Sequence, residues 1–140
     1  MKEIMVAYWS GTGNTAAMAT ILGKGIQDGG AAAKVVSVED IKADDLKDYP
    51  VFALGCPSMG NETLEETVME DFVTEVESFA SGKKIGLFGS YGWGDGEWMR
   101  NWEESCKEAG ANLVCDSVIC QEEPDDEATD ACKALGAALV

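Results

Sequence analysis

Short apolar runs alternate along this chain with stretches of helical spacing, and this alternation limits the fold more than any other feature. In the helical stretches apolar residues recur three or four positions apart, as Met18, Leu22 and Ile26 do. Buried strands that alternate with helices indicate a parallel sheet covered on both faces. We therefore predict a doubly wound α/β fold, a three-layer αβα domain over residues 1–140. Its five strands are expected at residues 3–8, 33–38, 51–55, 84–88 and 112–120.

Helices are expected between these strands and after the last one. The stretch at 43–48 is at best a short helix, whereas the other four each carry one apolar face. In open parallel sheets ligands bind at the carboxyl ends of the strands, so the turns after the first, third and fourth strands should converge on one site. The expected inward faces are Met18, Ile21, Leu22 and Ile26; Val68, Phe72, Val73, Val76 and Phe79; Trp98, Met99, Trp102, Cys106 and Ala109; and Ala128, Ala131, Cys132, Leu135 and Leu139.

Net charge excludes several classes of function. The chain has 26 acidic and 10 basic residues and no histidine, for a net charge of −16, while 46% of its residues are hydrophobic and suffice for a core. Such an acidic protein repels nucleic acid and anionic membranes. Without histidine there is no histidine-based triad, imidazole proton shuttle or histidine-containing metal site. No run approaches the ~20 apolar residues of a membrane span, and the first residues are unlike a signal segment.

The cysteines indicate a reducing compartment. There are five, at Cys56, Cys106, Cys115, Cys120 and Cys132, with no C-x-x-C pair among them. This spacing argues against a disulfide framework, a structural zinc site and the common iron–sulfur motifs. All except Cys56 are interpreted as small buried apolar residues. We expect a cytoplasmic location.

The turn after the first strand is suited to a phosphate group. It reads Ser10-Gly11-Thr12-Gly13-Asn14-Thr15, without the lysine of a Walker loop or the third glycine of G-x-G-x-x-G. Glycines let backbone N–H groups point inward at a helix N-terminus, and hydroxyls add further donors. Because no Lys or Arg lies between Lys2 and Lys24, a single phosphomonoester held by neutral groups is predicted rather than a triphosphate.

The other two turns could enclose a planar ring. Trp93 stands between Gly92 and Gly94, where an indole fits neither a strand nor a helix core and instead suggests a stacking surface. Met59 could supply the opposite side, since its thioether packs well on aromatic faces. The adjacent Gly60 allows a positive φ and two peptide orientations.

In these motifs and over all 140 residues, the sequence resembles the flavodoxin family. The matching stretches are Tyr8–Thr15, Leu54–Gly60 and Leu87–Gly96, in the right order and spacing. The resemblance implies strand order 2-1-3-4-5 and a ligand at the strand one/strand three switch point, the placement that flavodoxin exemplifies. The length and an uninterrupted fifth strand resemble the short-chain branch.

The resemblance implies FMN as the cofactor. Met59 and Trp93 would sandwich the isoalloxazine ring, the Gly60 carbonyl would turn toward the nitrogen that gains a proton in the semiquinone, and Glu62 would bind the N–H edge of the ring. The phosphate would be held by Ser10, Gly11, Thr12, Gly13, Asn14 and Thr15. The other implied cofactor-binding residues are Pro57, Ser58, Asn61, Gly89, Ser90, Tyr91, Gly92 and Gln121.

The resemblance further implies a low-potential one-electron carrier, cycling between semiquinone and hydroquinone without substrate turnover of its own. It would act as a monomer between redox enzymes such as reductases and iron–sulfur oxidoreductases. Acids crowd residues 61–77, with seven acids and no base, and residues 122–130, with six more. At ~10 Å each carboxylate opposes an added electron by about half a kcal/mol before screening. These acids should depress the hydroquinone couple and attract basic docking surfaces.

The same residues bear on other functions. The runner-up is a small FMN-dependent reductase of the same fold, similar to quinone reductases, but 140 residues leave little room for a substrate pocket. A binding module without redox chemistry is disfavoured by Met59 and Trp93 flanking Gly60. A receiver domain needs an Asp ending the third strand, where Gly55 stands. A low-molecular-weight phosphatase needs C-x₅-R in the first turn, which has neither residue.

Overall fold

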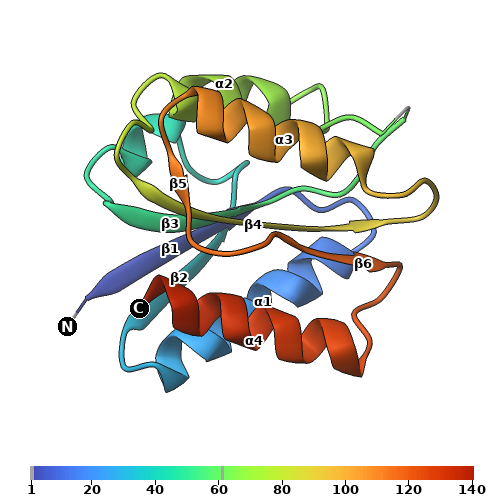
Figure 1. Cartoon of the computed structure of the whole chain (residues 1–140), viewed down its shortest axis with the longest axis horizontal. Coiled ribbons are helices and arrows are strands. Elements are labelled where there is room, and N and C mark those ends of the chain that lie inside the picture. The colour runs from blue at the N-terminus through green and yellow to red at the C-terminus, as the bar shows by residue number, and fades with distance from the viewer. Residues whose placement is uncertain (1, 61) are drawn as a thin grey trace.

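The computed structural model describes residues 2–60 and 62–140, which form a central sheet between two pairs of helices. Helices α1 and α4 cover one face of the sheet, and α2 and α3 cover the other (Figure 1). The strands are β1 (Glu3–Tyr8), β2 (Ala32–Ser37), β3 (Val51–Gly55), β4 (Lys84–Tyr91), β5 (Asn112–Leu113) and β6 (Val118–Gln121); the helices are α1 (Asn14–Asp28), α2 (Met69–Glu77), α3 (Glu97–Glu108) and α4 (Asp126–Leu139), with a 3₁₀ turn, η1 (Ala43–Leu46).

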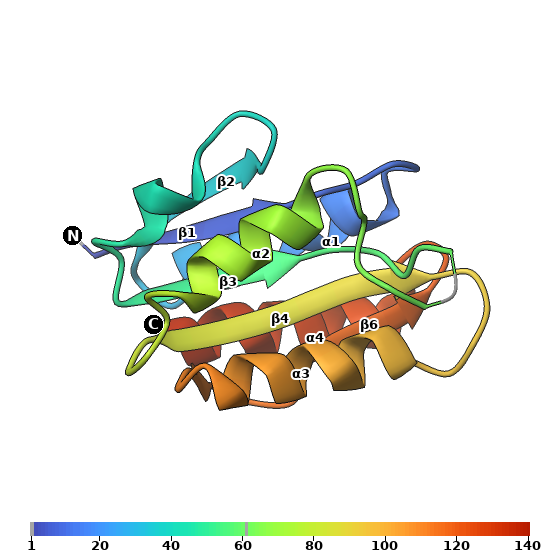
Figure 2. The same ribbon diagram turned by 90° about the horizontal axis from the view of Figure 1, so that it is seen from above.

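The sheet has the expected order. Its strands run β2-β1-β3-β4-β5, with β6 also pairing β4, and every described pair is parallel. Seen from above, β2 lies at one side of the sheet and β4 lies toward the other, beside β6 (Figure 2). The predicted α/β class, three layers and strand order are thus confirmed.

The fifth strand, predicted as one uninterrupted run over 112–120, is wrong in detail because the chain forms two short strands there. Ile85 pairs with Leu113 and Phe88 with Val118, so β4 advances three residues while its neighbour advances five. Two extra residues must leave the ladder, as in a β-bulge. The bulge exposes Cys115, which corrects the prediction that this thiol is buried.

Smaller differences affect the other predicted boundaries. Strand β4 continues three residues past its predicted end at Phe88, because Gly89, Ser90 and Tyr91 keep pairing with β6. Strand β2 begins and ends one residue earlier than predicted, and the short helix expected at 43–48 is reduced to η1. Strands β1 and β3 match their predicted bounds.

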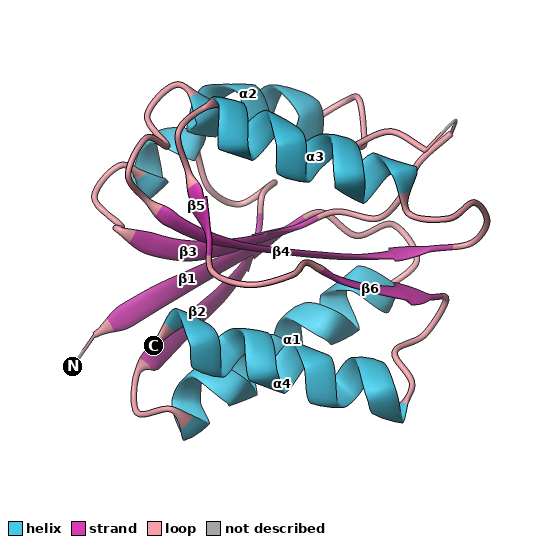
Figure 3. Ribbon diagram, viewed as in Figure 1, coloured by secondary structure: helices cyan, strands magenta, loops and turns pink. Residues whose placement is uncertain are grey.

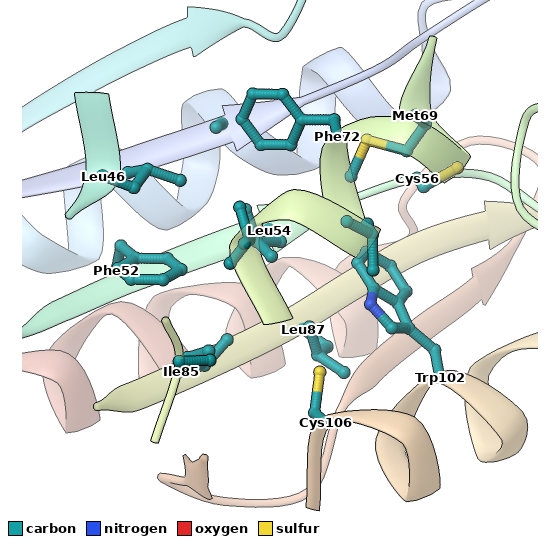
Figure 4. Packing of buried hydrophobic residues seen from close by; sticks show 14 of the residues in the cluster. Leu46, Phe52, Leu54, Cys56, Met69, Phe72, Ile85, Leu87, Trp102 and Cys106 are labelled. Atoms are coloured by element: carbon teal, nitrogen blue, oxygen red, sulfur yellow. The ribbon is translucent and has the colours of Figure 1, made fainter. Parts of the chain in front are cut away.

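Two apolar clusters fill the spaces between sheet and helices. The cluster under α2 and α3 includes Phe52, Leu54, Leu87 and Trp102 (Figure 4), and the cluster against α1 and α4 is centred on residues such as Phe88. With both faces covered, the carboxyl ends of β1, β3, β4 and β6 and the loops after them gather at the right-hand end of the molecule in Figure 3. Among residues 2–60 and 62–140, none of the helices combines the length and apolar character that crossing a membrane requires.

Candidate functional site

A cleft of about 200 Å³ opens where these loops meet. We call the segments around it the first loop (residues 10–15), the second loop (57–60 and 62) and the third loop (92–96). The cleft is lined by Trp9, Gly11, Thr12, Asn14, Pro57, Ser58, Met59, Ser90, Tyr91, Gly92 and Glu122. The structure therefore brings the three predicted turns together, and it adds Trp9 and Glu122, which were not predicted to bind the cofactor.

The first loop is a set of backbone donors at the start of α1. The Ser10 hydroxyl oxygen accepts hydrogen bonds from the N–H groups of Gly13 (3.1 Å) and Ala16 (3.3 Å), which braces the loop from within. Gly13 has φ +98°, a conformation that costs any other residue steric strain. In the described first loop, five backbone N–H groups make no hydrogen bond, those of Ser10, Gly11, Thr12, Asn14 and Thr15. The loop can therefore receive an anion without any basic side chain.

Thr15 and Ser90 join the first loop to the end of β4. Both are buried, and the Ser90 N–H donates to the Thr15 hydroxyl oxygen at 3.4 Å. The Ser90 hydroxyl in turn donates to the carbonyl oxygen of Glu122 at 2.6 Å. Gln121 supports the same region, since its Nε2 donates to the Gly92 carbonyl at 3.2 Å. These predicted site residues hold neighbouring loops in place.

The second loop is a tight turn closed at its base. Met59 and Thr63 exchange two backbone hydrogen bonds of 2.9 Å. Above this base Gly60 has φ +52°, as the predicted turn requires, and Glu62 has φ +57°, which is uncommon for a residue with a side chain. Asn61, also a predicted site residue, lies outside the described residues.

The carboxylate of Glu62 joins the second loop to the third. Its side chain is only 6% exposed, and its two oxygens accept hydrogen bonds from the N–H groups of Asp95 and Glu97, each at 2.8 Å. Gly94 must be glycine here, because a Cβ atom would lie 1.2 Å from a Glu62 oxygen. Helix α3 has no side-chain cap from its own N-cap residue, Gly96, in the described structure. Glu62 therefore caps α3 from a distant segment, where the positive end of the helix favours a carboxylate.

Glu65 likewise caps a helix, α2, but it lies only a few residues before the start of that helix. Its buried carboxylate accepts from the N–H groups of Thr67 (2.7 Å), Val68 (2.9 Å) and Met69 (2.8 Å) and from the Thr67 hydroxyl. Burial raises the pKa of Glu65, but these hydrogen bonds lower it by more, so the pKa lies below its ordinary value of 4.5. The Glu65 N–H also donates to the Cys56 sulfur at 3.4 Å.

The Cys56 thiol is a packing group and not a nucleophile. It is fully buried, and this burial, with a smaller contribution from the charge of Glu65, raises its pKa to about 12, although the Glu65 backbone hydrogen bond lowers it somewhat. At neutral pH the thiol is therefore protonated. It donates to the Pro57 carbonyl oxygen at 3.4 Å, which ties the end of β3 to the second loop.

The third loop carries an exposed aromatic ring. Trp93 is 62% exposed and does not line the cleft, in contrast to Met59, which does. The preceding Tyr91 stays tied to the core, with its ring centroid 5.7 Å from that of buried Trp98. Gly89 lies inside β4, paired with Ile119. Trp93 is thus an exposed ring that follows Gly92, a residue of the cleft lining.

Comparison with known proteins places the whole chain in one group. The family model described as flavodoxin matches residues 6–136. The flavodoxin of Clostridium beijerinckii is 46% identical over 125 residues, covering 89% of this chain and 91% of that protein. The flavodoxin of Megasphaera elsdenii is 44% identical, covering 96% of each. The solution structure of two-electron reduced Megasphaera elsdenii flavodoxin superposes with a TM-score of 0.89 and covers 97% of each chain.

Proposed function

This chain belongs to the flavodoxin family, and on that premise we propose which of its residues hold the cofactor and how they serve electron transfer. The protein binds FMN and is a low-potential electron carrier, not an enzyme. Its partners are redox proteins, and the reductase-like alternative is not supported. FMN supplies one-electron transfer at its isoalloxazine ring.

The first loop fits the phosphate of FMN. Five backbone N–H groups there have no partner within the described residues, and they lie at the N-terminal end of α1, where partial positive charge favours an anion. The hydroxyls of Ser10, Thr12 and Thr15 and the amide of Asn14 stand in the same segment. Glycine is favoured at Gly13 by its φ of +98° and not by crowding, since nothing lies within 4 Å of the position that a Cβ atom would take. This set of free donors is the observation that carries the assignment.

The second and third loops would hold the ring. A cleft of about 200 Å³ is smaller than the ~300–1,000 Å³ of a pocket that encloses its ligand. The ring is therefore expected to keep an edge outside the cleft, between Met59 and Trp93. The remaining groups assigned to the ring and the ribityl chain are the Gly60 carbonyl, Asn61, and parts of Pro57, Ser58, Gly89, Ser90, Tyr91, Gly92 and Gln121.

Glu62 is assigned to the N–H edge of the ring while it caps α3. Each carboxylate oxygen can accept two hydrogen bonds, and each already accepts one from the third loop. One acceptor position therefore remains on each oxygen. The same carboxylate would then hold both the ring edge and the loop that presents Trp93.

The acidic surface near these loops would shape both the potential and the docking of partners. Among the acids of residues 61–77, Glu62 and Glu65 are buried and cap helices. The exposed acids of this segment include Glu66, Glu70 and Asp71. These exposed carboxylates disfavour an additional electron on the cofactor and attract a partner with a basic docking surface. Net charge of −16 further supports a monomer, and five unpaired cysteines support a cytoplasmic location.

An anaerobic reductive titration with spectral detection tests the proposal. The purified protein should show flavin absorbance, and neutralising exposed acids in Glu66→Gln/Glu70→Gln/Asp71→Asn should raise the second midpoint potential by up to about 50 mV before salt screening. The matched control neutralises three exposed acids at the opposite end of the sheet, Asp28→Asn/Asp48→Asn/Glu108→Gln. A protein that takes up no FMN would overturn the site assignment, and equal shifts in both triple variants would overturn the electrostatic one.

A further inference from the structure

One edge of the sheet ends in β6, which presents unpaired backbone groups. In the described part of the chain β6 pairs with β4 alone. The Glu122 N–H donates to Tyr91 of β4 at 2.9 Å, so strand alternation directs the backbone groups of Cys120 toward β4 and those of Ile119 and Gln121 toward the open edge. The Ile119 side chain is 37% exposed. Such an edge can accept another strand.

A groove runs beside this edge. It has a volume of about 750 Å³ and lies between β6 and α4, which are neighbours in Figure 1. Its apolar part is formed by side chains such as Ala131, Ala134 and Ala138 of α4. Alanines leave room beside the strand for the side chains of an occupant, so the groove can receive every second residue of an extended segment.

The charges around the groove select its occupant. The described residues that line it include three acids, Asp116, Asp125 and Glu127, and no Lys or Arg. A second copy of this chain would bring these acids against themselves, and each copy already carries a net charge of −16. A segment whose groove-facing residues are apolar in the middle and basic at the ends would instead match both the alanines and the acids.

The groove leads directly to the functional site. Cys120 and Gln121 line its end, and the Gln121 side chain donates to the Gly92 carbonyl of the third loop at 3.2 Å. The next residue, Glu122, lines the cleft. An occupant of the groove would therefore end beside the region assigned to the isoalloxazine ring.

We propose that the β6 edge and its groove dock an extended, Lys- or Arg-rich segment of a redox partner, which adds as a strand beside β6 with apolar side chains on the α4 alanines. The backbone groups of Ile119 and Gln121 pair with the added strand, while Asp116 and Glu127 pair with its basic side chains. Only the identity of the occupant as a redox partner rests on the proposed function. The dock supplies orientation, since it places the partner at one defined side of the cleft.

The test uses the FMN-loaded protein and a synthetic peptide, Lys-Thr-Val-Thr-Val-Thr-Lys blocked at both ends, in which the lysines and valines share one face of an added strand. Amide hydrogen exchange measured by NMR should show that the peptide slows exchange at Ile119 and Gln121 by tenfold or more. The matched control peptide carries N-methylated valines, which keeps its charge but removes the donors that an added strand needs. It should give no protection at these two amides.

Two double variants distinguish binding in the groove from attraction to the overall negative charge of the protein. Asp116→Asn/Glu127→Gln should weaken binding of the lysine–valine peptide at least fivefold, whereas Asp48→Asn/Glu108→Gln, at the opposite end of the sheet from the cleft, should change it less than twofold. Protection by the N-methylated peptide, equal loss in both variants, or no protection at Ile119 and Gln121 would each overturn the dock. The flavin absorbance of the same samples reports the proposed function separately, so its failure is recognised independently.

Discussion

The first loop and the pair formed by the second and third loops reach the same cleft by different means. The first loop is one continuous segment braced by its own serine, with Ser10 bonded to Gly13 and Ala16. The second and third loops are separate segments, joined by the Glu62 carboxylate across 33 and 35 positions of the chain. One part of the site is therefore local, and the other depends on a single buried contact.

This difference separates two tasks of the site. Backbone donors at a helix N-terminus exist as soon as α1 forms, so the first loop should keep its function when distant residues change. The spacing between Met59 and Trp93 is not fixed by one local segment, because the two residues lie on different loops. Glu62 is the direct link between these loops, and its loss should change ring binding and leave the phosphate cradle intact.

The largest effect is expected for Glu62→Ala. It removes two hydrogen bonds to a carboxylate and uncaps α3, so the free energy of unfolding of the FMN-free protein should fall by about 3 kcal/mol. Urea unfolding measures this loss, and NMR should show faster exchange of the Asp95 and Glu97 amides. The matched control is Glu66→Ala, which removes an exposed acid nearby. Similar losses in both variants would contradict a linking role for Glu62.

A smaller, pH-dependent effect is expected for Glu65→Gln, which weakens the local cap of α2. At neutral pH the variant should lose about 2 kcal/mol of unfolding free energy. Because the pKa of Glu65 is lowered in the folded state, its ionised form stabilises the wild type above the ordinary pKa of 4.5, and this stabilisation disappears as pH falls through the lowered value.

Urea unfolding at several pH values tests this linkage. The difference in stability between wild type and Glu65→Gln should be constant above pH 6 and should shrink as the medium is acidified below the ordinary carboxyl pKa. A difference that grows on acidification would contradict the assignment. Because Glu65 caps only its own helix, exchange at the Asp95 amide should remain as in the wild type.

The smallest loss of stability is expected for Ser10→Ala, about 1 kcal/mol, because the serine oxygen accepts only neutral hydrogen bonds on a partly exposed loop. Without this brace the first loop must be ordered when a phosphate binds, so affinity for FMN should fall roughly tenfold. Isothermal titration measures the affinity. Ser78→Ala, whose hydroxyl bonds to Glu75 at the far end of α2, is the control and should leave FMN binding unchanged.

Local features of the sequence predicted the fold and the first loop well. Strands β1 and β3 are short apolar runs followed within two residues by Ser10 and Pro57, and their predicted bounds match the structure. The first loop is predicted to bind a phosphate because its hydroxyls and glycines are consecutive, and the structure shows N–H groups without partners in the described loop. In both cases the residues that carry the sequence pattern are the same few residues that form the structural feature.

Contacts between distant segments could not be predicted in the same way. Nothing around Glu62 indicates that its carboxylate caps a helix beginning at Glu97. The bulge that exposes Cys115 arises from a mismatch with the neighbouring strand β4, which residues 112–120 do not show on their own. The positions of Trp9 and Glu122 at the cleft likewise follow from which strand ends lie side by side.

The account is tested most directly by the ratio of the affinities for FMN and for riboflavin, which lacks the phosphate. Both ligands are titrated into the wild type and into the Ser10→Ala and Glu62→Ala variants. Ser10→Ala should reduce the preference for FMN roughly tenfold while riboflavin binding stays constant, and Glu62→Ala should weaken both ligands by the same factor. A Glu62→Ala protein that loses its preference for FMN to the same extent would contradict the division between a local phosphate cradle and ring-binding loops joined by one carboxylate.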